Sequence, residues 1–378
     1  MAPPATFVES MALQEVMISS PPDIKPTSSN INDAAPTGGR RVFKSTGPAF
    51  VPIYGVYGGH LLGQSAYAAY KTVDKSFYCH SITGHFLVGG KPKIPFIYTV
   101  ETLRQGKTYC TRNVQVRQPS PTDPRPLDSE VIFIATVSFK TVEPRGLESQ
   151  VPPPKELKQW VSNPRGREIA PAVDVPSWIE FTKRKGMRSF YTAVDLRKVD
   201  VEEENRSRPL HEYRKVQIYK PVGSFPSEEQ SCLSICTHIY ASDRNGMFAV
   251  TGPHNASDNI IHTGSLSHTL IFHANPDKLL FSNTNEGEEE DNPSSWTILE
   301  QLGDSASEGR GLIRSRIWSA DGTLLASVMQ DALIRVRVDN GEKVDRRKPT
   351  FSESLKNPLV NEGGLKEVLV YKDEIDVL

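Results

Sequence analysis

Residues 227–246 read SEEQSCLSICTHIYASDRNG, and they decide the fold because they predict one buried helix that ends at Asp243. Ser227 and Gln230 have the spacing of a capping box at the helix start. Apolar side chains recur at helical spacing on one face, which predicts burial of Cys232, Leu233, Cys236, Ile239 and Tyr240. Asn245-Gly246 is a turn signal that ends the helix. A carboxylate at Asp243 opposes the helix macrodipole, although a simple Asx turn would also explain it.

A second helix is predicted within residues 54–73, YGVYGGHLLGQSAYAAYKTV, after a turn at Gly58-Gly59. Its buried face has a four-three-four spacing and consists of Leu62, Ala66, Ala69 and Val73. Small residues keep this helix slim, which suits a structure that wraps closely around it. The two glycines also let backbone N–H groups approach a ligand oxygen, but a tight turn without any ligand explains them equally well.

Strand-like segments follow each helix, four in each half of the chain. They lie at 76–87, 95–103, 109–117 and 130–142, and again at 263–273, 297–302, 311–318 and 323–338. The last segments even resemble each other, with FIATVSF at 133–139 and LLASVMQ at 324–330. An internal duplication explains this order, so we predict an α+β fold with two copies of a helix wrapped by a curled antiparallel β-sheet.

Composition changes along the chain divide it into five parts. We expect a poorly ordered extension at 1–40, a first copy at 41–142, a Pro-rich linker at 143–185, a second copy at 186–340 and a polar tail at 341–378. Within the linker, only residues 156–162 suggest a short helix.

The overall composition excludes several classes of protein. The formal net charge of the 378 residues is −1, which gives no basic field for nucleic acid or an anionic membrane. No apolar run approaches the ~18 residues that a membrane-spanning helix needs. The N-terminus lacks the pattern of a secretion signal. Cys79, Cys110, Cys232 and Cys236 have no metal-binding spacing and read as reduced packing residues of an intracellular protein.

Several motifs go further and resemble one family, the acyl-CoA thioesterase II enzymes with a double hotdog fold. They are VYGGHLLGQSAYAAYKTV at 56–73, HFL at 85–87, YTVETLRQGKTYCTRNVQVRQ at 98–118 and IATVSF at 134–139 in the first half. In the second half they are YASDRN at 240–245, GSLSHTLIFHA at 264–274 and DGTLLASVMQDALIR at 321–335. The resemblance spans most of residues 41–338 in the right order.

The resemblance implies a catalytic carboxylate, hydroxyl and amide that together hold an attacking water. Matching the motifs places these groups on Asp243, Ser265 and Gln330. By themselves, Ser265 and Gln330 would read as ordinary polar residues of strands. The chain departs from the family at Ser267, which replaces an aspartate before His268, and at Val88-Gly89-Gly90-Lys91, which replaces Arg-Pro-Gly-Asp.

The chemistry fits these residue types. A carboxylate with an ordinary pKa of about 3.9 is ionised near neutral pH and can polarise water, and partial burial behind the helix would raise the basicity of Asp243. A hydroxyl and an amide can orient that water. The start of the first helix, at Gly58, Gly59 and His60, offers candidate substrate-binding or oxyanion groups. Arg104, Lys107, Arg112, Arg314 and Arg316 are basic candidates for coenzyme A contacts, although most such residues are solvated.

Other chemistries fit less well. No Gly-x-Ser-x-Gly elbow is present, and His268 and His273 have no evident acidic partner for a serine triad. A hotdog enoyl-CoA hydratase or dehydratase would need an aspartate just upstream of His60. The remaining alternative is a non-catalytic acyl-CoA-binding hotdog protein.

We therefore expect an enzyme that hydrolyses fatty acyl-CoA to free fatty acid and coenzyme A, with no cofactor and no metal. Its expected partners are the acyl-CoA substrate and further copies of itself, paired through the hotdog sheets; we expect no nucleic acid and no membrane span. The C-terminus, Ile375-Asp376-Val377-Leu378, is not a Ser-Lys-Leu signal, so the expected location is cytoplasmic or peroxisomal.

Overall fold

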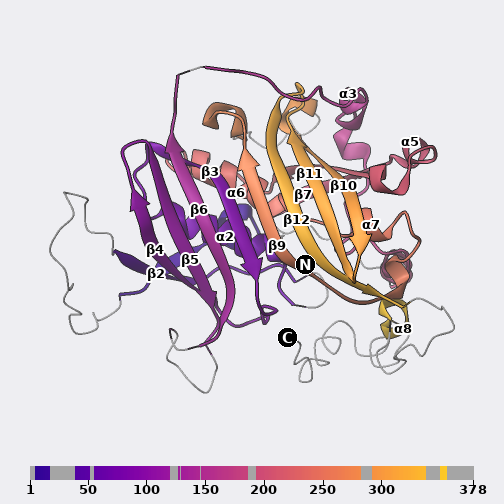
Figure 1. Cartoon of the computed structure of the whole chain (residues 1–378), viewed down its shortest axis with the longest axis horizontal. Coiled ribbons are helices and arrows are strands. Elements are labelled where there is room, and N and C mark those ends of the chain that lie inside the picture. The colour runs from indigo at the N-terminus through magenta and orange to yellow at the C-terminus, as the bar shows by residue number, and fades with distance from the viewer. Residues whose placement is uncertain are drawn as a thin grey trace.

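The computed structural model describes residues 5–17, 39–51, 55–119, 127, 129–144, 146–185, 193–281, 292–337 and 350–355. All twelve strands form one sheet, in the order β1-β2-β4-β5-β6-β3-β9-β12-β11-β10-β8-β7 (Figure 1). The strands are β1 (Leu13–Glu15), β2 (Arg40–Ser45), β3 (Phe77–Phe86), β4 (Ile97–Gln105), β5 (Tyr109–Arg117), β6 (Val131–Thr141), β7 (Val194–Val199), β8 (Arg214–Pro221), β9 (Ile260–Phe272), β10 (Thr297–Ser307), β11 (Arg310–Trp318) and β12 (Leu324–Val336).

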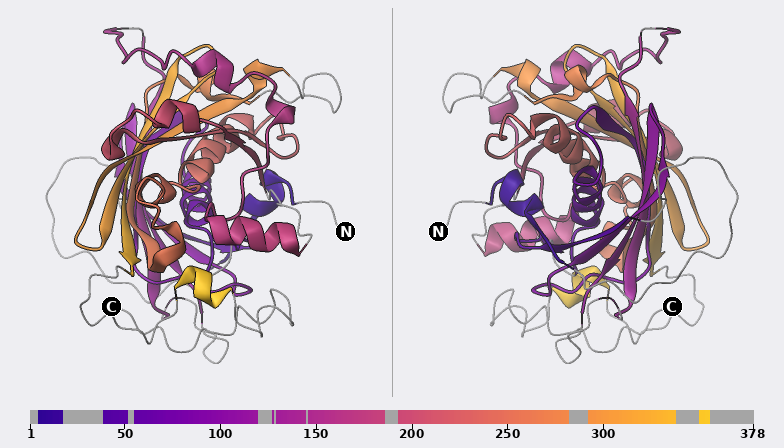
Figure 2. Two further views of the ribbon diagram at one scale, coloured as in Figure 1. Left: turned by 90° about the vertical axis from the view of Figure 1, so that its right-hand side faces the viewer. Right: turned by 90° about the vertical axis from the view of Figure 1, so that its left-hand side faces the viewer.

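The helices are α1 (Phe7–Met11), α2 (Gly58–Tyr70), α3 (Leu157–Trp160), α4 (Pro176–Arg184), α5 (Glu202–Asn205), α6 (Gln230–Ser242), α7 (Phe248–Thr251) and α8 (Phe351–Ser354). Among these, α2 and α6 lie side by side in the hollow of the curved sheet (Figure 2). They run antiparallel, because Lys71 at the end of α2 pairs with Glu229 at the start of α6. The predicted α+β fold, with two helices wrapped by an antiparallel sheet, is confirmed.

The sheet order confirms the internal duplication. Strands β2-β4-β5-β6-β3 in the first half match β8-β10-β11-β12-β9 in the second, and the two halves join through β3 and β9. Ile82 of β3 pairs directly with Leu270 of β9. Because Ile82 also pairs with Val137 and Leu270 with Val328, these two residues occupy equivalent places in their halves. The pseudo-two-fold axis therefore passes between Ile82 and Leu270.

Helix α6 is buried almost all round, beyond the single face that its apolar spacing predicts. Every residue from Leu233 to Ser242 is buried, since α6 packs on α2 as well as on the sheet. The predicted capping box at Ser227 is wrong: the helix begins at Gln230, and its N-cap residue Glu229 makes no capping hydrogen bond. The Glu229 carboxylate contacts Lys71 and the Tyr67 hydroxyl instead, so contacts between the two helices replace the local cap.

Gly58 and Gly59 are the first residues of α2, so the prediction that they form a turn ahead of the helix is wrong. The second glycine is required by a close approach of the two helices. A side chain at Gly59 would begin only 2.3 Å from the carbonyl oxygen of Tyr240 in α6. The Tyr57 hydroxyl donates to that same oxygen at 2.6 Å, which fixes the start of α2 against the end of α6.

The prediction of a poorly ordered extension at 1–40 is wrong for its first part. Thr6 and Glu9 form a capping box for α1, and Phe7 and Met11 are fully buried against the helix pair. Strand β1 adds to the sheet edge through β2. Two buried apolar side chains are enough to anchor this short segment, and residues 18–38 lie outside the described part.

The predicted linker carries more structure than its prolines suggest. Besides α3, it contains α4, which begins at Pro176 and buries Trp178 and Phe181 in a small cluster with Val175 and Phe248. In the predicted tail, α8 packs on the same cluster, and residues 338–349 and 356–378 lie outside the described part. All four cysteines are free, and three are buried, as predicted for packing residues.

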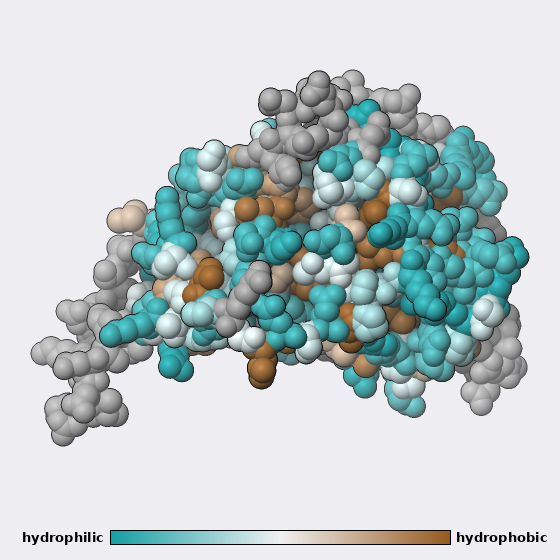
Figure 3. Space-filling model, turned by 90° about the horizontal axis from the view of Figure 1, so that it is seen from above, coloured by the Kyte–Doolittle hydropathy of each residue, from teal (hydrophilic) through white to brown (hydrophobic). Residues whose placement is uncertain are grey.

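Within the described residues, no helix is long and apolar enough to cross a membrane. Figure 3 shows one face of the molecule, where hydrophilic side chains dominate and hydrophobic ones gather in small separate groups.

We predict that Gly59→Ala lowers stability sharply, because the new methyl group would overlap the Tyr240 backbone and the Tyr57 ring. Overpacking of this kind costs about 1–3 kcal/mol or more. Chemical denaturation of both proteins would measure the loss. Gly89→Ala is the matched control, since nothing lies within 4 Å of its added methyl group. Equal stability of the two variants would contradict the close helix contact.

Candidate active site

Asp243 is the C-cap residue of α6 and lies where that helix meets the start of α2. Its Oδ1 accepts a hydrogen bond from Ser265 Oγ at 3.0 Å and another from Gln330 Nε2 at 2.7 Å. Gln330 Nε2 also donates to Ser265 Oγ at 2.7 Å. The three residues predicted from the motifs therefore form one hydrogen-bonded group, and the Asx-turn interpretation of Asp243 does not apply.

Strand register brings Ser265 and Gln330 to the same inner face of the sheet. Gln330 of β12 pairs with His268 of β9, and both side chains are buried. Simple alternation from His268 would turn Ser265 to the opposite face. A β-bulge between Ser265 and Ser267 shifts the register by one residue and returns Ser265 to the inner face.

The start of α2 closes the other side of the carboxylate. The backbone N–H of Gly59 donates to Asp243, and a side chain at Gly58 would begin 2.7 Å from Asp243 Oδ2. His60 is fully buried, with its ring 6.0 Å from that of Phe96 and 6.3 Å from that of Tyr240. Among the described residues, neither ring nitrogen of His60 has a hydrogen-bond partner. Burial lowers the pKa of His60 to about 4, so the ring is neutral at physiological pH.

Burial dominates the electrostatics of Asp243, which is only 7% exposed. Loss of solvation raises the pKa of this carboxyl to about 7, although hydrogen bonds from Ser265, Gly59 and Gln330 act in the opposite direction. The shift has the direction expected from burial of this residue behind the helix. At neutral pH, Asp243 is divided between its acid and its carboxylate forms, which is the range where a general base works well.

His268 is a neighbour of Asp243 that the sequence did not reveal. Its Nδ1 lies 3.8 Å from Asp243 Oδ1, and its Nε2 lies 2.9 Å from Ser242 Oγ. Since the Ser242 hydroxyl donates to the Ile239 carbonyl, His268 Nε2 carries the proton and donates to Ser242. Burial lowers the pKa of His268 to about 3, so the ring is neutral and its Nδ1 lone pair faces the carboxylate.

This geometry is not that of a serine hydrolase triad. Ser265 bonds directly to the carboxylate, while His268 bonds to Ser242, so no imidazole is placed to take a proton from Ser265. Asp243 approaches the neutral His268 ring, but the two do not form a serine triad with Ser265. In the sequence, only the presence of a histidine at this position could have indicated the contact. His268 and Asp243 are far apart in the chain and are brought together by folding.

Two of the basic residues proposed for coenzyme A have other roles. Arg112 is only 2% exposed and donates to the Thr72 hydroxyl and carbonyl at the end of α2. Arg314 pairs with Asp304 at 2.9 Å. No group of three or more His, Cys, Asp or Glu side chains is placed to hold a metal ion within the part of the chain that the structure describes.

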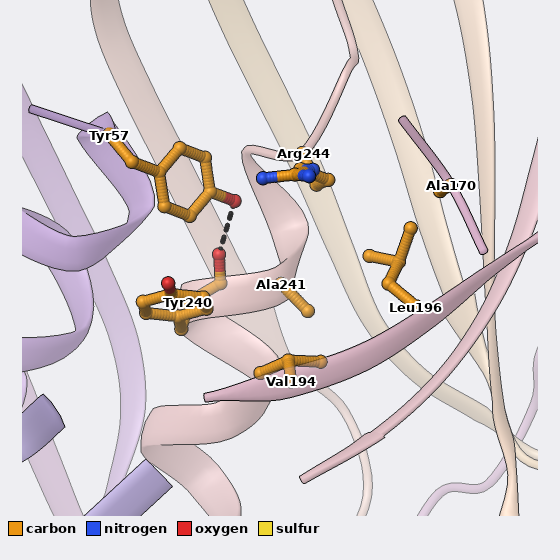
Figure 4. Close-up of a pocket in the computed structure, with 7 residues that line it drawn as sticks. All are labelled: Tyr57, Ala170, Val194, Leu196, Tyr240, Ala241 and Arg244. Carbon is orange, nitrogen blue, oxygen red and sulfur yellow. Dashed lines mark hydrogen bonds between the residues drawn. The ribbon is translucent and has the colours of Figure 1, made fainter. Parts of the chain in front are cut away.

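A narrow cavity lies beside the end of α6 (Figure 4). It is lined by Tyr57, Ala170, Val194, Leu196, Tyr240, Ala241 and Arg244. The Arg244 guanidinium lies 4.5 Å from the centre of the Phe50 ring and donates to the Pro171 carbonyl at 3.2 Å. Ala170 of the predicted linker and Val194 and Leu196 of β7 therefore form one wall of this cavity, opposite the end of α6.

Two family models match the chain. The model described as the acyl-CoA thioesterase N-terminal domain matches residues 48–140, and that described as the acyl-CoA thioesterase C-terminal domain matches residues 116–334. The second alone covers more than half of the chain and includes Asp243, Ser265 and Gln330.

Curated relatives agree with this match. Human acyl-coenzyme A thioesterase 8 is 25% identical over 76% of this chain and 83% of its own length. Acyl-CoA thioesterase 2 of Haemophilus influenzae is 24% identical over 74% of this chain and 87% of its own. A peroxisomal acyl-coenzyme A thioester hydrolase of Saccharomyces cerevisiae is 34% identical over 64 residues, which are 17% of this chain and 18% of its own.

Solved structures support the fold. Acyl-CoA thioesterase II TesB2 from Mycobacterium marinum superposes with a TM-score of 0.58 at 22% identity, covering 89% of this chain and 99% of its own. A putative thioesterase II from Thermobifida fusca gives a TM-score of 0.54 at 13% identity, with the same coverage. The chain therefore belongs to the acyl-CoA thioesterase family, and its two halves form a double hotdog.

Proposed function

We propose that the chain hydrolyses fatty acyl-CoA to a free fatty acid and coenzyme A, with Asp243 as the general base that activates water. One observation carries the proposal: a buried carboxyl with a pKa raised to about 7 is hydrogen-bonded to a hydroxyl and an amide that can orient a water molecule. The family membership supplies the reaction class, and the roles of individual residues are inferred from the site.

In the proposed reaction, Asp243 takes a proton from water while the water oxygen attacks the thioester carbonyl. Ser265 and Gln330 hold that water in line with the carbonyl carbon. The tetrahedral intermediate then expels the coenzyme A thiolate, to which Asp243 returns the proton. Because a thiol has a pKa of about 8.5, the leaving group needs no strong acid.

The oxyanion of the intermediate needs a hydrogen-bond donor, and we place that donor at the start of α2. The N–H of Gly59 is engaged by Asp243 and that of His60 by the Tyr57 carbonyl. Of the three candidates at the start of α2, Gly58 is the one whose N–H is left to donate to the oxyanion. The partial positive charge at the start of α2 strengthens this interaction. Gly58 also lies against Phe86, whose ring would border the acyl group.

The alternative of a non-catalytic acyl-CoA-binding protein predicts tight binding without turnover. The site does not favour it, because a scaffold that only binds has no use for an unpaired buried carboxylate, which is costly to keep. We place the enzyme in the cytoplasm or the peroxisome, and the name of the yeast relative favours the peroxisome. Pairing of copies through the outer face of the sheet stays a proposal.

We predict that Asp243→Asn lowers kcat for thiol release from acyl-CoA by about 10²–10⁴-fold, the usual contribution of a general base. The measurement is thiol release across acyl chain lengths, with Asp304→Asn as the control because Asp304 is held in a partly exposed ion pair with Arg314. Near-normal turnover by the Asp243 variant would remove this residue from the mechanism. Tight binding of acyl-CoA by the wild type without thiol release would favour the binding-protein alternative.

We further predict that kcat/KM rises with pH through a midpoint near 7. The base must be ionised, and its pKa is about 7, so activity falls about tenfold for each pH unit below the midpoint. Initial rates between pH 5 and 9, with a substrate that carries no titrating acyl group, would measure the profile. A midpoint near 4 would mean that Asp243 is an ordinary solvated carboxylate.

A further inference from the structure

The pseudo-two-fold axis allows each residue around Asp243 to be compared with its counterpart in the first half. The helices α2 and α6 are both 13 residues long, so Lys71 is the counterpart of Asp243. Strand register gives the remaining counterparts. Phe77, Phe139, Thr102, Arg112 and Arg41 of the first half correspond to Ser265, Gln330, Gln301, Ser315 and Gln217 of the second.

In the first half, cations hold the end of the central helix. Arg41 donates to the Lys71 carbonyl. Arg112 donates to the Thr72 hydroxyl at 2.9 Å and to the Thr72 carbonyl at 3.1 Å. Carbonyl groups at a helix C-terminus carry partial negative charge, so these guanidinium groups are favourable there.

In the second half, the same positions hold neutral groups. Gln217 Nε2 lies 3.4 Å from the Arg244 carbonyl at the end of α6 and 3.2 Å from Gln301 Oε1. Gln217 is 2% exposed, Gln301 is fully buried and Ser315 is 1% exposed. Gln217 and Ser315 therefore stand where the first half has Arg41 and Arg112, and Gln301 stands where it has the neutral Thr102.

Gln301 and Gln330 both reach the turn that follows α6, at Gly246. Gln301 Nε2 and Gln330 Oε1 converge on Gly246, lying 3.0 and 2.9 Å from the point where a side chain would begin. Gln330 in turn donates to Asp243. Gln217, Gln301 and Gln330 come from β8, β10 and β12, and all three side chains are buried.

We propose that Gln217 and Gln301 are positioning residues, which hold the end of α6 and the turn at Gly246 without adding a cation beside Asp243. This inference rests on the proposed function of Asp243 as a base. The amides supply the hydrogen bonds that the end of the helix needs, and they add no charge that would favour the ionised carboxylate and so weaken it as a base.

The other groups that face Asp243 are consistent with a neutral environment. His268 is uncharged, and the Tyr57 hydroxyl stays protonated, since burial raises the pKa of Tyr57 well above its ordinary value. Arg244 is the exception, and its guanidinium is directed to the Phe50 and Tyr57 rings and to the Pro171 carbonyl. Asp174 also interacts with Arg244 but is paired with Lys215, and Arg244 opposes part of the rise in the pKa of Asp243.

The test changes charge with little change of shape. Gln217→Lys adds a cation and should shift the Asp243 titration down by about half a pH unit or more, while Gln301→Glu adds an anion and should shift it up by a similar amount. Gln301→Met removes the amide without adding charge, so the titration should move little while kcat falls because the end of α6 and the turn at Gly246 are less well held.

The titration is read directly from the carboxyl carbon signals of 13C-Asp-labelled protein, with Asp243→Asn to assign the signal. The pH profile of kcat/KM is the second readout. Folding of each variant is checked by thermal melting, and Gln301→Glu decides alone if the lysine variant does not fold. A titration unmoved in the folded charge variants would overturn the proposal. If the titration moves but no protein releases thiol, the neutral layer stands and the proposed function fails.

Discussion

The structure depends on the close antiparallel contact between α2 and α6, which is tightest where Gly59 meets the Tyr240 carbonyl. A residue larger than glycine cannot occupy this place without moving the backbone of one helix. The contact sets the direction in which α6 ends, and so it places the Asp243 carboxylate against the first turn of α2. Sheet strands from both halves then close around the pair and exclude water from it.

Exclusion of water creates the chemical character of Asp243. A carboxylate in an apolar interior is unstable, and the hydrogen bonds from Ser265, Gly59 and Gln330 offset only part of that cost. The outcome is a pKa of about 7, so the site keeps a base that accepts protons readily at neutral pH. The buried carboxylate lowers the stability of the protein locally, which is typical of functional sites. The large hydrophobic core shared by both halves compensates for this loss.

The two duplicated halves differ at the positions of the site, so the described part of the chain has one such site. At the other end of the helix pair, the counterparts of the three site residues are Lys71, Phe77 and Phe139. Lys71 pairs with Glu229, and the two phenylalanines fill the space that the water and its polar partners would need. One half has therefore become a packing partner that supplies the helix start, while the other carries the proposed chemistry.

The sequence alone determined the two helices, the strands, their duplication and, through family motifs, the identity of Asp243, Ser265 and Gln330. Hydrophobic spacing and turn residues act locally, so they can be read from the chain. The sequence could not determine that the Ser265 side chain faces inward, because this orientation depends on the β-bulge between Ser265 and Ser267. Nor could it determine how far burial raises the pKa of Asp243, the approach of His268 or the neutral amides behind Gln330, since burial and distance depend on residues far apart in sequence. The anchoring of α1 was missed for the same reason, because Phe7 and Met11 are stabilised by a core that the rest of the chain builds.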